Sequence, residues 1–327
     1  MSYPEESGGE PRRPDEIDLG DGRVIVLRRV GEGGPFPPGA PYRGPEPQPG
    51  PRHPWPLILF LATVASTFLV GSGTAEGFNW RHGLFYSGGI MTILLCHELG
   101  HFFQARRYGV PASLPIFLPM PISFVGTLGA LILMRPRTAR TREMFDIAIS
   151  GPLAGLVPTF ACILIGLPQS KIVPSLSSSP GSVQLGEPLI LTWLTELLLP
   201  NLPAGQTLEL SPLAFAGWFG LLITALNLLP IGQLDGGHVM YTLARRHAFQ
   251  ISAVLVLAAA LGMIVTGYWM WTLMLLLLLI FGIRHPPLAD DPVADDLGWP
   301  RRLLGWITLL VSALLFLTPM PIQMSDL

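Results

Sequence analysis

The sequence predicts an all-α polytopic membrane protein with about seven transmembrane helices. Half of its 327 residues are hydrophobic and 13% are charged, with a mean hydropathy of +0.49, whereas soluble globular domains carry about 25% charged residues. Long apolar runs begin at Leu57, and about 20 apolar residues cross the hydrocarbon core of a bilayer. The formal net charge of −2 provides no field that would attract nucleic acid. The expected surroundings are therefore a lipid bilayer, with no nucleic-acid partner.

Two regions of different composition divide the chain. Residues 1–56 hold 13 of the 34 prolines, together with many glycines and charges of both signs. Such a segment buries too little apolar area to offset the entropy of ordering, so we expect a solvated Pro/Gly-rich cytoplasmic tail with a short strand within 23–30. No apolar stretch follows the N-terminus, which argues against a signal peptide. Residues 57–320 are expected to form one membrane domain.

Two of the apolar stretches are poor candidates for crossing. The stretch 113–134 contains three prolines, which interrupt a continuous helix, and 188–200 is short for a span. The remaining apolar stretches are expected to cross near 57–73, 83–105, 145–167, 213–230, 249–267, 268–283 and 302–318.

The basic residues favour seven crossings. Short cytoplasmic loops are enriched in Lys and Arg, and seven spans place 18 of the 20 basic residues on one side, with Arg81 and Lys171 on the other. This requires 113–134 to enter the membrane and return as a re-entrant loop or hairpin between the second and third helices, because basic clusters flank it on both sides. The N-terminus then faces the cytoplasm. The high ratio of Arg to Lys favours a bacterial plasma (inner) membrane.

Residues 97–101 read HELGH within the second predicted span. On an α-helix, positions i and i+4 project from the same side one turn apart, so His97 and His101 can reach one metal ion. Glu98 stands beside them and can accept a proton from water. Two histidines and one carboxylate suit Zn²⁺ with an open position for water, a set that serves peptide hydrolysis. The alternative is a buried polar cluster that only fixes helix packing, at a cost of roughly 2.5–3.5 kcal/mol per charged residue at the membrane centre.

A third ligand is expected in residues 227–238, which read NLLPIGQLDGGH. Asp235 follows an apolar run that Pro230 interrupts, and the neighbouring glycines let the backbone approach closely. In the predicted orientation this segment and the HELGH helix both approach the cytoplasmic face. A second interpretation is that Asp235 caps the following helix. His238 has two interpretations as well, either stabilising an oxyanion or a water near the metal, or making a polar contact at a helix start.

Together the two motifs resemble the site-2 protease family of intramembrane zinc metalloproteases. HExxH at 97–101 is followed by the pattern NxxPxxxxDG at 227–236, and every motif position is present. The segments FVGTLGA at 124–130 and FDIAISGPLAG at 145–155 are similar to the bacterial and plastid branch. The segment 168–212 is too short for the PDZ domain that many bacterial relatives insert. The resemblance covers about 57–320.

The resemblance implies a role for each motif residue. His97, His101 and Asp235 would bind one Zn²⁺ per chain, and Glu98 would act as general base. Asn227 would hydrogen-bond the substrate backbone. The stretch that includes Gly126, Thr127 and Gly129 would offer an edge strand to an extended peptide, although close helix packing also explains glycines in a membrane protein.

The implied function is that of an intramembrane zinc metallo-endopeptidase that cleaves transmembrane or membrane-anchored proteins in regulated intramembrane proteolysis. The active site would face the cytoplasm, and without a PDZ domain a regulatory membrane partner is one source of substrate recognition. The alternative is a non-hydrolytic metal-binding membrane protein, either a pseudoprotease chaperone or a transporter. The intact Glu98 disfavours the first, and the sequence shows no internal repeat of the kind that many transporters carry.

Overall fold

The computed structural model describes residues 16–18, 24–26, 54–74, 77–134, 136–174, 183–200, 202–203, 205–267, 282–289, 297–316 and 322–324, with isolated positions between 268 and 281. The chain divides into two compact units, Met1–Glu46 and Pro47–Leu327. In the first unit, β1 (Glu16–Asp18) pairs antiparallel with β2 (Val24–Val26). The second strand falls in the stretch where the sequence predicts one. The rest of the predicted tail lies outside the described residues.

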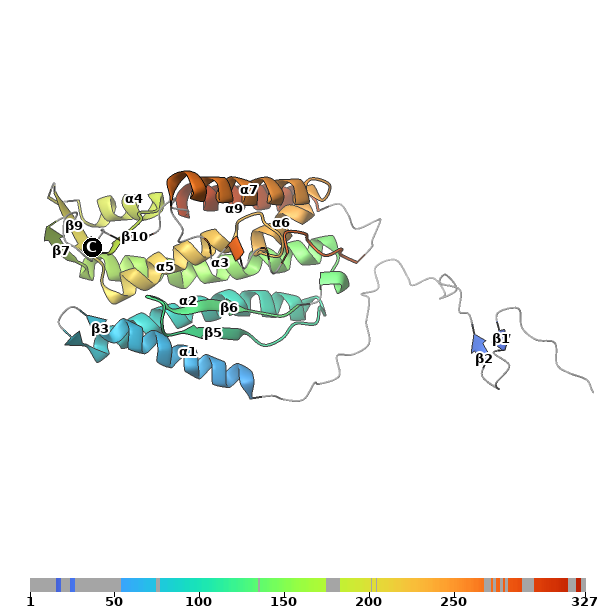
Figure 1. Cartoon of the computed structure of the whole chain (residues 1–327), viewed down its shortest axis with the longest axis horizontal. Helices are drawn as coiled ribbons and strands as arrows, with labels where there is room; N and C mark the ends of the chain where they lie inside the picture. Colours follow the sequence, from blue (N-terminus) through green and yellow to red (C-terminus); the bar gives the residue numbers. More distant parts are fainter. Residues whose placement is uncertain are drawn as a thin grey trace, which may run out of the picture. The chain divides into compact units, whose positions relative to one another are not determined.

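The second unit is mostly helical (Figure 1). Helices stand at six of the seven predicted spans, and the seventh, 268–283, falls largely outside the described residues. The last of the six continues as a π-helical turn, Ser312–Phe316. These helices are α1 (Trp55–Ser72), α2 (Trp80–Arg107), α3 (Thr141–Gly166), α5 (Pro212–Asn227), α7 (Ala248–Thr266) and α9 (Trp299–Val311). Two ten-residue helices accompany them, α4 (Leu189–Leu198) and α6 (Asp235–Ala244).

Three helices of the described chain are long and apolar enough to cross a membrane: Trp55–Ser72, Thr141–Gln169 and Ala248–Val265. The outer surface of α7 carries large exposed side chains such as Val254, Leu257 and Val265, which is the surface expected of a helix that faces lipid. The count of seven crossings stays a prediction.

The stretch between α2 and α3 forms a β-hairpin. Strand β5 (Ile116–Met120) pairs antiparallel with β6 (Gly126–Leu131), with a register shift between Leu118 and Pro119. Figure 1 shows the hairpin beside α1 and α2. Its prolines exclude a helix, as the sequence indicates. Whether the hairpin enters the membrane stays a prediction.

Helix α1 holds the turn end of this hairpin. The Ser66 hydroxyl donates a hydrogen bond of 2.6 Å to the Gly126 carbonyl oxygen. Gly126 has φ +84°, and a Cβ atom there would lie 2.8 Å from the Thr67 Cα atom. Only glycine allows both this backbone conformation and this contact.

Three further strand pairs join helix ends, so the prediction of an all-α protein needs correction at its connections. Antiparallel pairing of short extended segments satisfies backbone groups that would otherwise lack partners where helices end. The pairs are β3 (Gly73–Thr74) with β4 (Gly77–Phe78), β7 (Lys171–Pro174) with β9 (Gln206–Glu209), and β8 (Val183–Leu185) with β10 (Ile322–Met324). The described chain also has 3₁₀ turns at Pro136–Thr138 and Leu167–Gln169.

Helices α2, α3 and α5 form the centre of the unit. Small residues let their backbones approach closely, as is typical of membrane helices. A Cβ atom on Gly166 would lie 2.2 Å from the Ala214 nitrogen, and one on Gly217 would lie 2.5 Å from the Ile163 side chain. The fully buried Trp218 and Tyr86 fill the core beside these contacts. This packing fixes α2, which carries the HELGH motif.

Candidate metal centre

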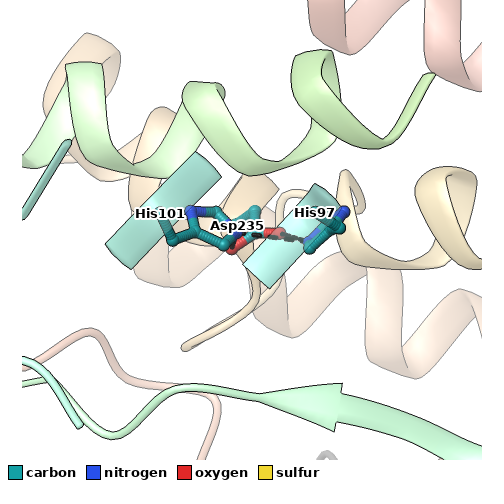
Figure 2. A group of neighbouring side chains, drawn as sticks. All are labelled: His97, His101 and Asp235. Carbon is teal, nitrogen blue, oxygen red and sulfur yellow. Dashed lines mark hydrogen bonds and ion pairs between the residues drawn. The ribbon is translucent and has the colours of Figure 1, made fainter. Parts of the chain in front are cut away.

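The two histidines of the HELGH motif meet Asp235 inside the helical unit (Figure 2). His97 and His101 lie one turn apart on α2, and Asp235 is the first residue of α6. The two Nε2 atoms are 3.2 Å apart, and each is 3.2 Å from one oxygen of the Asp235 carboxylate. Four tetrahedral ligands at zinc's usual bond lengths would be separated by about 3.3 Å. The spacing and the donor set therefore fit a zinc ion with an open position.

Helix α3 orients one of the ligands. The Nδ1–H of His101 donates a hydrogen bond of 2.7 Å to the Ile147 carbonyl oxygen. Because a carbonyl only accepts, this bond places the proton on Nδ1 and leaves the Nε2 lone pair facing the centre. Backbone carbonyls are common partners of metal-binding histidines, and they fix both ring orientation and tautomer.

Glycines bring α2 and α3 close enough for that bond. A Cβ atom on Gly151 would lie 2.1 Å from the His101 Nε2 atom, and one on Gly155 would lie 3.1 Å from the His97 Cβ atom. On α2, a Cβ atom on Gly100 would lie 2.6 Å from the Ser150 carbonyl oxygen. The absence of side chains at these positions makes the space that the two imidazoles occupy.

Two further glycines place Asp235. Helix α5 ends at Asn227, and α6 begins at Asp235 after a connection of turns and bends over 228–234. A Cβ atom on Gly236 would lie 2.1 Å from the Leu228 carbonyl oxygen, and one on Gly237 would lie 2.4 Å from the Gly232 carbonyl oxygen. The first turn of α6 can therefore pack directly on the turn that follows α5. This arrangement carries the carboxylate to the histidines, and the helix dipole favours a negative charge there.

The three candidate ligands line a cavity of about 250 Å³. Glu98 forms part of its wall and is 4% exposed, so its carboxylate is shielded from bulk water. The Nδ2 atom of Asn227 lies 3.3 Å from the His97 Nε2 atom, which places its amide at the centre. The other lining residues are Ala130, Leu131, Ile132, Leu133, Met134, Pro136, Ile147, Ala148, Gln233, Leu234 and His238.

The predicted substrate-binding residues of the hairpin lie just beyond this wall. The Thr127 hydroxyl donates to the Leu118 carbonyl oxygen at 2.9 Å and accepts from the Gly129 N–H at 2.9 Å, so it stabilises the hairpin itself. Gly126 contacts α1. Residues 130–134 of the same segment face the cavity. A substrate role for Gly126, Thr127 and Gly129 stays a prediction.

Sequence reasoning missed several parts of the centre. The carbonyl of Ile147 has no sequence signal, because every residue carries one. Gly151 lies in a segment that resembles the family. Its close approach to the His101 ring could not be predicted from the sequence, because it depends on how α3 packs against α2. His285, which contacts His238, lies far from both motifs in the sequence.

Comparison with known proteins identifies the family of this chain. The model of peptidase family M50 matches residues 85–266, more than half of the chain. That match includes the HELGH motif, the hairpin and the Asp235 segment. The chain belongs to peptidase family M50, the site-2 protease family. The expected family is therefore confirmed.

The chain is also similar to plant proteins that are named as zinc metalloproteases. The chain is 30% identical over 243 residues to "Probable zinc metalloprotease EGY2, chloroplastic" of Arabidopsis thaliana, covering 70% of this chain and 41% of that protein. It is 36% identical over 163 residues to "Probable zinc metalloprotease EGY1, chloroplastic" of Oryza sativa subsp. japonica, covering 46% of this chain and 26% of that protein. The chain thus spans less than half the length of these relatives. The plastid type therefore matches, within the bacterial and plastid branch that the sequence motifs resemble.

Proposed function

We propose that the protein is an intramembrane zinc endopeptidase that cleaves transmembrane or membrane-anchored proteins and binds one zinc ion per chain. The observation that carries this proposal is the meeting of His97, His101 and Asp235 in a cavity that also contains the buried Glu98. The names of the plant relatives as zinc metalloproteases support the same activity.

The residues of the cavity can have different roles in peptide hydrolysis. Glu98 accepts a proton from the attacking water and passes it to the nitrogen of the leaving amine, so the peptide C–N bond breaks as the amine forms. The Asn227 amide hydrogen-bonds the substrate backbone beside the scissile bond. When zinc is bound, it polarises the carbonyl and makes water a stronger nucleophile.

The hairpin suggests how substrate is held. A transmembrane helix hides its carbonyls in i→i+4 hydrogen bonds, so a segment must unwind before attack. Among the described residues, β6 pairs with β5 alone, and residues 130–134 continue from β6 along the cavity. An unwound peptide can add to such an edge as a further strand, which compensates its released backbone groups.

The membrane setting is part of the proposal. The apolar helices support a multi-pass protein, and the distribution of basic residues supports a cytoplasmic N-terminus and active site. We place the protein in a bacterial plasma membrane from its high ratio of Arg to Lys. The relatives named above are chloroplastic, so their names do not support a bacterial membrane. The proposal also includes a regulatory membrane partner for substrate recognition, because the segment 168–212 is too short for a PDZ domain.

Cleavage of a reconstituted substrate tests the proposal. The purified protein is placed in liposomes with a generic single-span substrate, and the products are identified by mass spectrometry. We expect one or a few cuts within or next to the span, abolished by a zinc chelator and restored by added zinc. Zinc-loaded protein that leaves a panel of such substrates intact would favour the non-hydrolytic alternative.

A further inference from the structure

The wall of the metal cavity holds a histidine that is not one of the three ligands. His238 lies on α6 one turn after Asp235, is 9% exposed and lines the cavity. It is outside the group of side chains whose ligand atoms lie within 4.8 Å of one another. Its Nδ1 atom is 2.6 Å from the Nε2 atom of His285.

The backbone determines which nitrogen of His285 carries the proton. The His285 Nδ1 atom lies 2.5 Å from the Pro286 carbonyl oxygen. Because that oxygen only accepts, Nδ1 must be the donor, and Nε2 of the neutral ring has a free lone pair. The ring also stacks on Tyr241, with centroids 4.0 Å apart and planes at 12°. Both contacts hold the ring in one orientation.

The same reasoning extends to His238. Its Nδ1–H must donate to the His285 Nε2 atom, so its own Nε2 atom carries a lone pair. His285 lines a different cavity, of about 140 Å³, that also includes Gly237, Arg245 and Arg284. His238 lines the metal cavity, while the Nδ1 edge of its ring contacts His285.

Burial keeps both rings neutral. It lowers the pKa of His238 to about 4, with nearby Asp235 opposing the change and His101 adding to it. Burial also lowers the pKa of His285 to about 3, and the charge of Arg245 contributes in the same direction. The tautomers assigned above apply to neutral rings and therefore hold at neutral pH.

We propose that His238 accepts a hydrogen bond from the attacking water through its Nε2 atom, and that His285 is the positioning residue that fixes its tautomer. A water molecule has two O–H bonds. Glu98 takes the proton of one, and His238 accepts a hydrogen bond from the other without taking its proton. With both bonds directed, an oxygen lone pair can point at the substrate carbonyl. This inference rests on the proposed function.

Steady-state kinetics on the zinc-loaded, full-length protein test the two roles. His238→Ala should lower kcat about 10-fold to 100-fold, the range for one lost hydrogen bond at a reacting group, with KM and zinc content unchanged. His285→Phe keeps a ring to stack on Tyr241 but offers no acceptor, so it should lower kcat as well. His285→Gln supplies an amide oxygen and should recover part of the loss. The matched control is His82→Ala, because His82 lies near the N-terminal end of α2, away from the HELGH motif. This variant should have the kcat of wild type.

Nitrogen NMR of histidine-labelled protein provides a readout that does not depend on cleavage. The signals of His238 are assigned as those that disappear from the spectrum of His238→Ala. The proposal expects a protonated Nδ1 and an unprotonated Nε2 at neutral pH, and expects this pattern to be lost in His285→Phe. A proton on Nε2, or loss of zinc from His238→Ala, would overturn the proposal. If wild type cleaves nothing while the expected tautomer is seen, the proposed function fails and the histidine arrangement stands.

Discussion

The Nδ1 atom of His101 lies 2.7 Å from the carbonyl oxygen of Ile147, so α3 sets the tautomer of a candidate metal ligand on α2. The two helices can approach this closely because Gly100 and Gly151 face each other's helix without side chains. Ile147 is followed one turn later by Gly151, and together they provide the hydrogen bond and the space for the ring. The metal centre therefore depends on helix packing as much as on the HELGH motif.

Replacing Gly151 by alanine should disturb the centre without touching a ligand. The new Cβ atom would lie 2.1 Å from the His101 Nε2 atom, so the imidazole or the helix must shift. We expect zinc bound per chain, measured by elemental analysis after purification, to fall well below that of wild type.

Gly88→Ala is the matched control for that change. Gly88 lies on α2, and a Cβ atom there would meet nothing within 4 Å. Alanine favours a helix by about 1 kcal/mol over glycine, so this variant should keep its zinc and be at least as stable. Wild-type zinc content in Gly151→Ala would show that the packing of α3 does not hold the His101 ring.

Removal of any one ligand should empty the metal site. Wild-type protein is expected to bind about one zinc per chain, as a single site of this type does. His97→Ala, His101→Ala and Asp235→Ala should each purify with little zinc. Circular dichroism checks that the helices remain. Full zinc occupancy in Asp235→Ala would remove that carboxylate from the ligand set.

The hairpin between α2 and α3 should leave both of its ends on the cytoplasmic side. In a background in which the free cysteines Cys96 and Cys162 are replaced, single cysteines are placed at Ser113 and at Arg137. An impermeant thiol reagent should label both from the cytoplasmic side only, because basic clusters flank the stretch. Labelling of the two positions from opposite sides would mean that 113–134 crosses the membrane.

The sequence predicts those features of the centre that depend on side-chain type and spacing. Helical periodicity places His97 and His101 on one face, and the glycines beside Asp235 indicate a close approach. The prolines of 113–134 exclude a helix but do not choose between a loop and strands. The β-hairpin is a result of tertiary contacts, such as the bond from Ser66 to Gly126.

The remaining features depend on atoms that leave no pattern in a sequence. One part of the cavity wall is formed by 130–134, which begins directly after Gly129, the last of the hairpin glycines that the family resemblance emphasises. The partner of His101 is a backbone carbonyl, and the partner of His238 comes from a segment 47 residues away. Contacts of this kind follow only from the packed arrangement of the helices.

The most direct test of the central claim compares zinc content and cleavage in Glu98→Gln. Glutamine keeps the size of the side chain but cannot accept a proton from the attacking water, and loss of a general base typically costs about 10²–10⁴-fold in rate. Because Glu98 is not a proposed ligand, the variant should bind as much zinc as wild type while cleaving a co-reconstituted substrate at least about 100-fold more slowly. Cleavage at the wild-type rate by zinc-loaded Glu98→Gln would contradict the account.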